Sequence, residues 1–211
     1  MAEVVGKSKA MERRSRPKEG AAVSGASGPG ATFRLQRSVV LVGMMGSGKT
    51  AIGRALALRL GVPFRDSDAE LEAAANATIA EIFARDGEAF FRNRETEVIG
   101  RLLRAAPSVL STGGGAFMSD RNRHAISEHG VSLWLDADLD TLWDRVRTKD
   151  TRPLLRTANP RATLGELYEM RVPIYRMADL SIATRPHYSI DETTGLVISA
   201  LLTRPDVLEL I

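Results

Sequence analysis

The amino-acid sequence predicts an α/β protein with a parallel five-stranded sheet and helices on both faces. From residue 38 onwards, short apolar segments alternate with segments of helical periodicity. Strands separated by helices are typical of parallel sheets, whose strands are buried on both faces. The expected strands are Val39–Val42, Pro63–Asp66, Ser108–Thr112, Val131–Leu135 and Leu180–Ala183.

Helical periodicity and capping residues mark the segments between these strands. The segment Thr50–Leu60 is followed by Gly61, a favourable residue just beyond a helix end. Thr78 and Glu81 have the spacing of a capping box and open another helix. The further expected helices are Glu88–Arg104, Ser119–Glu128, Leu139–Lys149, Thr163–Met177 and Asp191–Thr203.

A glycine-rich loop, Gly43–Thr50, joins the first expected strand to the first helix. Glycines let backbone N–H groups approach phosphate oxygens, and the helix N-terminus adds partial positive charge. Lys49 can reach the outer phosphates, and the Thr50 hydroxyl is a hard oxygen ligand for Mg²⁺. A glycine turn without a ligand is the alternative, but the strand–loop–helix context favours a P-loop. We therefore predict nucleoside triphosphate binding.

The amino-acid composition limits the number of domains and the cellular compartment that can be expected. The chain has 211 residues, 44% of them hydrophobic, which fits one domain with a substantial core. No window approaches the length of a membrane span, so no membrane association is expected. The chain has no cysteine, which excludes disulfides and thiolate chemistry and fits a cytoplasmic protein.

Residues 1–37 are predicted to be a disordered basic extension preceding one folded domain, residues 38–211. The extension is small, polar and glycine-rich, and it lacks the apolar core of a signal peptide. Its net charge is +5, while the remaining 21 basic and 23 acidic residues leave −2, so the domain shows no electrostatic sign of nucleic-acid binding. An organelle-targeting segment and a basic arm for an acidic partner are the alternatives to a solvated extension.

Two charged patterns suggest chemistry beside the P-loop. Asp66 and Asp68 follow the second expected strand, so one carboxylate can face a Mg²⁺-bound water and the other a substrate hydroxyl. The alternative is that Asp68 only caps the next helix. Arg92 and Glu95 are three residues apart in a helix, so the carboxylate can hold the guanidinium; taken alone, an ordinary surface pair is the better interpretation.

Three later features complete the candidate site. The glycines Gly113–Gly115 end the third strand and indicate a tight turn or a close approach to a ligand. The polar, proline-broken segment 150–161 contains Arg152 and fits a mobile lid over phosphates, with a solvated loop as the alternative. Arg171 can point a second guanidinium into the site. The histidines show no ligand spacing and are expected at the surface.

Missing motifs reduce the choice of P-loop class. The sequence has no Asn-Lys-x-Asp after the fourth strand and no Asp-x-x-Gly, which removes the usual GTPase equipment. It also lacks the Leu-Ser-Gly-Gly-Gln motif of transporter ATPases. A P-loop at the start of the domain and a lid near its end indicate a small-molecule or nucleotide kinase with a nucleoside monophosphate kinase-like fold.

At this point the sequence resembles the shikimate kinase family over about residues 38–203. The resemblance implies Mg²⁺-dependent transfer of the ATP γ-phosphate to the 3-hydroxyl of shikimate, on the pathway to chorismate and the aromatic amino acids. In chain order, the motifs that carry it are Gly43–Thr50, Asp66-x-Asp68, Gly87-Glu88-x-x-Phe91-Arg92-x-x-Glu95, Gly113–Gly115, Arg152-Pro153-Leu154 and Arg171-x-Pro173-x-Tyr175.

The resemblance also implies roles for individual residues. Lys49, Asp68 and Arg152 would be catalytic, with Asp68 as the candidate base. Mg²⁺ would be held by Thr50 and, through a water, by Asp66. The implied shikimate contacts are Asp68, Arg92, Gly114 and Arg171, and the implied ATP contacts are Gly46, Ser47, Gly48, Lys49, Thr50, Ala51 and Arg152.

The sequence departs from the family pattern in places, and two rival functions stay open. Ala51 replaces a frequent hydroxyl residue, Asn76 replaces a common glycine, and the adenine contact is unplaced, with Arg185 as a candidate. A related sugar-acid kinase such as a gluconate kinase is one rival, and a non-catalytic ATP-binding protein is the other. ATP and shikimate are the expected partners, and we expect a monomer.

Overall fold

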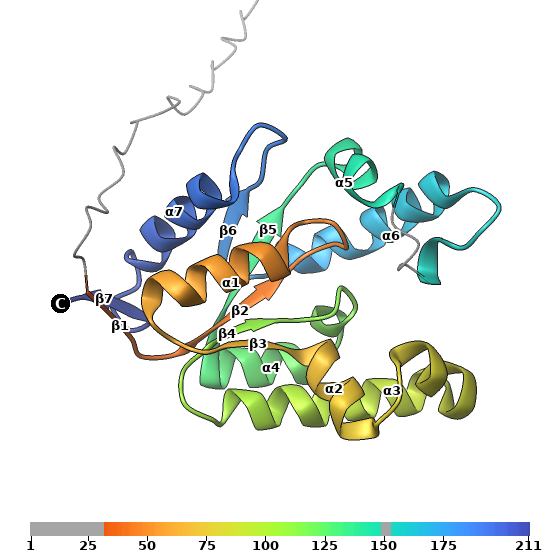
Figure 1. The fold of residues 1–211 in the computed structure, drawn as a ribbon, viewed down its shortest axis with the longest axis horizontal. Coiled ribbons are helices and arrows are strands. Elements are labelled where there is room, and N and C mark those ends of the chain that lie inside the picture. The colour runs from red at the N-terminus through yellow and green to blue at the C-terminus, as the bar shows by residue number, and fades with distance from the viewer. Residues whose placement is uncertain (1–31, 149–152) are drawn as a thin grey trace, which may run out of the picture.

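Five parallel strands form the central sheet, in the order β3-β4-β2-β5-β6 (Figure 1). The structure is a computed structural model that describes residues 32–148 and 153–211. All five expected strands are present, so the predicted fold class is confirmed. Their bounds are β2 Ser38–Val42, β3 Phe64–Asp66, β4 Val109–Ser111, β5 Gly130–Asp136 and β6 Leu180–Ala183.

Helices cover both faces of this sheet. Figure 1 shows α1 and α7 on one face and α3 and α4 on the other. In the described part of the chain, no helix is long and apolar enough to cross a membrane. The helices are α1 Lys49–Leu60, α2 Ser67–Ala75, α3 Ile79–Leu103, α4 Asp120–His129, α5 Leu139–Val146, α6 Pro160–Tyr175 and α7 Ile190–Leu201, with short 3-10 turns η1 Ala116–Met118 and η2 Pro153–Leu155.

The central strand β2 supplies both hydrophobic cores. Val39 and Leu41 belong to the core under α1 and α7, whereas Val40 and Val42 belong to the core under α3 and α6. Successive side chains of a strand point to opposite faces, so a strand covered on both faces is apolar throughout. Because β2 lies between β4 and β5, its carboxyl end opens at the centre of the sheet, where α/β proteins bind ligands.

The predicted extension has to be corrected at its end. Phe33–Leu35 forms strand β1, which pairs antiparallel with β7, Leu208–Leu210. Backbone bonds flank the pair: the Gln36 N–H donates to the Val207 carbonyl at 2.8 Å. Regular secondary structure therefore already begins at Phe33, within the predicted extension. Residues 1–31 lie outside the described part of the chain.

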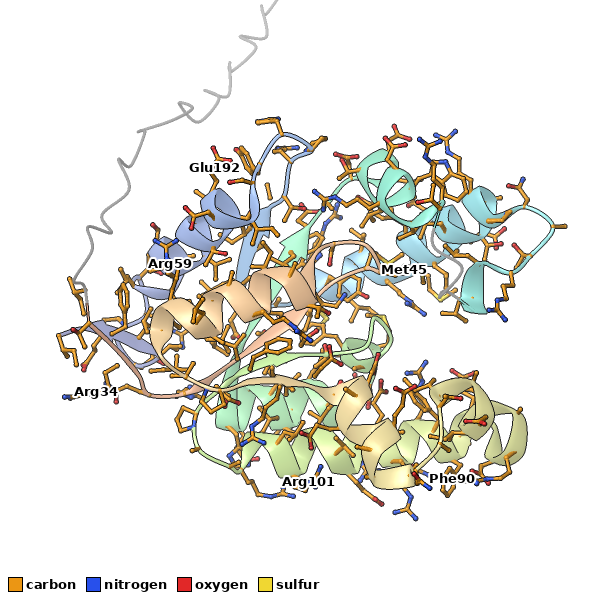
Figure 2. All side chains as sticks on the ribbon, viewed as in Figure 1. Arg34, Met45, Arg59, Phe90, Arg101 and Glu192 are labelled. Atoms are coloured by element: carbon orange, nitrogen blue, oxygen red, sulfur yellow. The ribbon has the colours of Figure 1, made fainter. Side chains whose placement is uncertain are left out.

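Several helix boundaries differ from expectation for local reasons. The segments opened by Thr78 and by Glu88 form one helix, α3, interrupted only at Gly87, which has φ 81° and ψ 172°. Helix α6 begins three residues early, because Asn159 caps it and Pro160 fits its first turn. Figure 2 shows Arg101 and Phe90 along α3 on the side away from the sheet; Arg101 donates to Glu70 of α2 at 2.9 Å, which ties these two helices together.

Candidate active site

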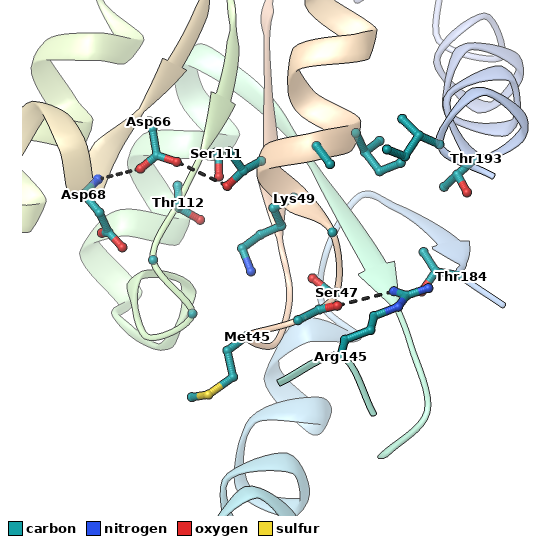
Figure 3. Close-up of a pocket in the computed structure, with 18 of the residues that line it drawn as sticks. Met45, Ser47, Lys49, Asp66, Asp68, Ser111, Thr112, Arg145, Thr184 and Thr193 are labelled. Atoms are coloured by element: carbon teal, nitrogen blue, oxygen red, sulfur yellow. Dashed lines mark hydrogen bonds between the residues drawn. The ribbon is translucent and has the colours of Figure 1, made fainter. Parts of the chain in front are cut away.

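A pocket of about 480 Å³ lies at the carboxyl ends of β2, β3 and β4 (Figure 3). The P-loop forms one wall, and the opposite wall contains Asp66, the last residue of β3, and Asp68, in the first turn of α2. Further wall residues come from the loop after β4, from α5, and from the connection between β6 and α7. Every P-loop residue predicted to contact ATP, from Gly46 to Ala51, lines this pocket.

The P-loop has the backbone that a phosphate ligand needs. Gly46 and Gly48 have φ values of 84° and 99°, in the left-handed region that favours glycine. A Cβ at Gly46 would lie 2.7 Å from Cγ1 of Val146, so α5 packs directly on the loop. The Lys49 ammonium donates to the carbonyls of Gly43 at 2.8 Å and Met44 at 2.9 Å. The lysine thus lies along the loop, with its charge in the pocket.

Thr50 and Asp66 bring two hard oxygens together at the N-terminus of α1. The Thr50 hydroxyl donates to Oδ2 of Asp66 at 3.5 Å. The other Asp66 oxygen caps α2 by accepting from the backbone N–H of Asp68 at 3.1 Å and of Ala69 at 3.4 Å. Among the described residues, no group of three or more His, Cys, Asp or Glu side chains could hold a metal unaided. Two oxygen donors beside a phosphate loop fit Mg²⁺, which completes its shell with phosphates and water.

Asp68 is not the cap of α2, because Asp66 occupies that position. Burial, reinforced by the charge of Asp66, raises the pKa of Asp68 to about 6, and Lys49 opposes this shift. A carboxylate with such a pKa is ionised at neutral pH and is also a competent proton acceptor. The structural alternative for Asp68, a simple helix cap, is therefore excluded.

Two glycines after β4 make room for two charged side chains. A Cβ at Gly113 would lie 2.7 Å from Oδ1 of Asp68, and a Cβ at Gly115 would lie 2.7 Å from Nη2 of Arg92. Cβ atoms do not approach other atoms this closely, so a larger residue at either position would require the end of the Asp68 or Arg92 side chain to move. The glycines therefore let these two charged side chains lie against the loop.

The middle glycine has the same relationship with Arg171. A Cβ at Gly114 would lie 3.3 Å from Nη1 of Arg171 and 3.6 Å from the carbonyl oxygen of Gly43. The loop after β4 thus touches Arg171 on one side and the P-loop backbone on the other. Gly114 lines the pocket, whereas Arg92 and Arg171 reach the glycine loop from outside that lining.

Arg92 is held by two carboxylates. Its Nη1 donates to Glu95 Oε2 at 2.9 Å, and its Nη2 donates to Glu88 Oε1 at 3.2 Å. Glu95 is only 2% exposed, so this is not the ordinary surface pair that the spacing alone favoured. Burial raises the pKa of Glu95, and the charge of Arg92 opposes that shift. The pair therefore fixes the guanidinium against the glycine loop.

Sequence reasoning missed Arg145 and did not place the nucleotide end of the pocket. Arg145 lies in the last turn of α5 and lines the pocket, with its Nη1 donating to the Gly46 carbonyl at 3.3 Å. The candidate Arg185 is not among the described residues that line the pocket. No local motif marks Arg145, because its position depends on the packing of α5 against the P-loop.

The remaining predictions divide between confirmed positions and an untested one. His124 and His187 are exposed and His129 is partly exposed, as expected. Arg152, which was assigned to the lid, lies outside the described residues.

The fold and the site together define a class of protein: a P-loop kinase with a carboxylate and two arginines gathered at the loop after β4. The family model described as shikimate kinase matches residues 45–201. The chain belongs to the shikimate kinase family.

Proteins named shikimate kinase are similar to this protein over most of its chain. A shikimate kinase of Ruegeria pomeroyi is 66% identical over 181 residues, which cover 86% of this chain and 93% of that protein. A shikimate kinase of Cereibacter sphaeroides is 62% identical over 176 residues, which cover 83% of this chain and 88% of that protein. A solved shikimate kinase from Acinetobacter baumannii in complex with shikimate has a TM-score of 0.74 and 37% identity, covering 80% of this chain and 94% of that one.

Proposed function

We propose that this protein transfers the γ-phosphate of ATP to the 3-hydroxyl of shikimate, giving shikimate 3-phosphate and ADP. One observation carries the acceptor assignment: Asp68, Arg92 and Arg171 all converge on the loop Gly113–Gly115, beside the P-loop. A family match and a relative solved with shikimate support the same reaction.

The chemistry of shikimate matches this set of side chains. Shikimate offers one carboxylate and three hydroxyls. Arginine binds carboxylates through two parallel hydrogen bonds, so Arg92 and Arg171 are proposed to hold the carboxylate. Asp68 is proposed to accept hydrogen bonds from hydroxyls, and the Gly114 backbone to contact the ring substituents.

The donor half is proposed to bind ATP with the P-loop amides on the phosphates. Thr50 would ligate Mg²⁺ directly and Asp66 through a water, since their oxygens meet at the start of α1. When bound, Mg²⁺ neutralises charge on the phosphates. Lys49 adds its own charge, Arg145 is proposed to contact the nucleotide, and Arg152 is proposed to close onto the phosphates.

The chain's residues then divide the reaction between them. Asp68 accepts the proton of the 3-hydroxyl as that oxygen attacks the γ-phosphorus. The bond between the γ-phosphorus and the bridging oxygen breaks, and ADP leaves with the electron pair. Lys49 stabilises charge on the transferring phosphoryl group, a kind of contribution that is usually the largest in phosphoryl transfer.

A coupled ADP-release assay with shikimate, quinate and gluconate tests this proposal. Turnover with shikimate at least about tenfold above the others is expected, because the fixed arginine pair selects one carboxylate geometry. Preference for gluconate would favour a sugar-acid kinase instead. ATP binding without turnover on any acid would favour a non-catalytic role.

We also propose that the protein acts as a monomer, because one chain supplies every residue of this site, and size-exclusion chromatography tests that.

A further inference from the structure

Tyr175, the last residue of α6, occupies an apolar slot beneath the acceptor side. Its side chain is completely buried. The ring centroid lies 6.2 Å from that of Trp134 on β5 and 6.4 Å from that of Phe117 in η1. The hydroxyl is the only polar group that the ring carries, so its partners decide whether this tyrosine does more than fill space.

Both partners of the Tyr175 hydroxyl belong to the proposed acceptor site. The hydroxyl donates to the carbonyl of Gly114 and accepts a hydrogen bond from the Arg171 side chain. A Cβ at Gly114 would lie 3.3 Å from Nη1 of Arg171 and 3.7 Å from the Tyr175 oxygen. Arg171 and Tyr175 are four residues apart on α6, so one helix face presents both groups to the loop. The three residues form a closed set of contacts.

We propose that Tyr175 is a positioning residue for the acceptor, which fixes the Gly114 carbonyl and sets the guanidinium of Arg171 for the acceptor carboxylate. This inference rests on the proposed function and deepens it. Burial raises the pKa of Tyr175 to about 12, so the hydroxyl keeps its proton and remains a donor at neutral pH.

A packing role and a positioning role make different predictions for Tyr175→Phe. Phenylalanine keeps the ring and its neighbours but removes the hydroxyl. If the ring alone matters, the variant keeps its affinity for both substrates. If the hydroxyl positions Arg171, the KM for shikimate rises about tenfold, the effect of losing a hydrogen bond to a charged group, while the KM for ATP stays within about twofold.

The chain offers a matched control on the same helix. Tyr168 of α6 is partly exposed and lies two turns before Tyr175. Tyr168→Phe makes the identical chemical change away from the glycine loop, and its shikimate KM should equal that of the wild type. Equal KM increases in both variants would overturn the inference.

A double-mutant cycle tests whether Tyr175 acts through Arg171. Shikimate dissociation constants are measured by calorimetry for Tyr175→Phe in the wild type, in Arg171→Ala and in Arg92→Ala. We expect the tenfold effect to shrink below about threefold in Arg171→Ala and to persist in Arg92→Ala, because interacting residues are non-additive. An undiminished effect in Arg171→Ala, or unchanged shikimate affinity in Tyr175→Phe, overturns the inference.

A second variant keeps the test decisive if Tyr175→Phe fails to fold. Gly114→Ala places a methyl group 3.3 Å from Nη1 of Arg171, in a tight contact, but only in ordinary contact with the Tyr175 oxygen at 3.7 Å, and it should raise the shikimate KM and leave the ATP KM unchanged. An unchanged shikimate KM would show that contact at this loop does not set the acceptor geometry, and would overturn the inference. A wild-type enzyme that turns over another acid, but not shikimate, would instead overturn the proposed function.

Discussion

A Cβ at position 113 would lie 2.7 Å from Oδ1 of Asp68, so the observed position of the Asp68 carboxylate requires a glycine at residue 113. The two residues follow the neighbouring strands β4 and β3, Gly113 in the loop after β4 and Asp68 in the first turn of α2. We therefore expect a larger side chain at this glycine to disturb the site, just as truncation of Asp68 would.

Gly113→Ala should lower kcat by about 100-fold or more, because its methyl group displaces the proposed base. The ATP dissociation constant should stay within about twofold, since the P-loop is untouched. Steady-state kinetics and calorimetry check both values. Gly165→Ala in α6 is the matched control: its methyl group would lie 3.7 Å from Leu139, an ordinary contact, so activity should be unchanged. Normal turnover in Gly113→Ala would remove Asp68 from its assigned position.

Lys49→Met should lower kcat by about 100- to 1,000-fold, the usual effect of removing one charge from the transferring group. Shikimate binding without ATP should be retained, because the Lys49 ammonium donates to the P-loop carbonyls of Gly43 and Met44. Single-turnover kinetics with a shikimate binding titration measure the two effects separately. Near-normal turnover would exclude the P-loop from the mechanism.

Asp68→Asn should lower kcat by at least about 100-fold, since the amide cannot accept the proton. It should also weaken shikimate binding, because the amide loses the charge that attracts hydroxyl donors. A variant in which only KM changes would make Asp68 a substrate-positioning residue and not a base.

The same substitution should alter the pH dependence of unfolding. Asp68 has a folded-state pKa of about 6, above its unfolded value, so the stability that it contributes is present at low pH and is lost as pH rises from 4 through 6. Without ATP and divalent cations, the free energy of unfolding of Asp68→Asn should exceed that of the wild type by about 1–2 kcal/mol at pH 7.5. This value is reduced because the Asp68 side chain is partly exposed to solvent. Near pH 4 the two free energies of unfolding should be equal. Urea denaturation at both pH values measures the difference, and a constant difference would contradict the buried charge.

Arg92→Ala and Arg171→Ala should each weaken shikimate binding by about 2–4 kcal/mol, as expected when a desolvated charge pair loses a partner. The double variant should cost less than the sum, because both arginines serve one anion. Glu95→Ala should act as a milder Arg92 variant, by releasing the guanidinium held at 2.9 Å. Calorimetry with shikimate and its methyl ester tests the clamp; equal affinity for ester and acid would show that it does not exist.

Two N-terminal truncations should differ in stability. Removing residues 1–30 should leave melting temperature and turnover nearly unchanged, because their composition predicts no core contacts. Removing residues 1–36 deletes β1, exposes the edge of β7, and should lower the melting temperature by several degrees. Differential scanning calorimetry compares the two. Equal melting temperatures would mean that the β1–β7 pair contributes nothing.

Sequence predicted most of this fold because its signals are local. The apolar run of β2, the P-loop glycines and the capping box at Thr78 each act within a few residues. The pairing of Phe33–Leu35 with Leu208–Leu210 could not be predicted, since each strand has three residues and the partner lies at the far end of the described chain.

The site also has features that the sequence predicted and features that it did not. The sequence predicted Asp68, Arg92 and Arg171 as site residues, but it did not predict that each side chain packs against a different glycine of Gly113–Gly115. Arg145 was missed for the same reason, because its place depends on packing between α5 and the P-loop. Contacts between distant segments are set by the folded sheet, and no local pattern encodes them.

The loop after β4 and the P-loop meet at Gly114 and Gly43, where a Cβ on the first would lie 3.6 Å from the carbonyl oxygen of the second. These loops leave neighbouring parallel strands, β4 and β2, whose register is fixed by backbone hydrogen bonds. At this point the spacing between the P-loop and the loop after β4 is therefore set by main-chain packing. The side chains that contact the acceptor can change during evolution while this spacing is kept.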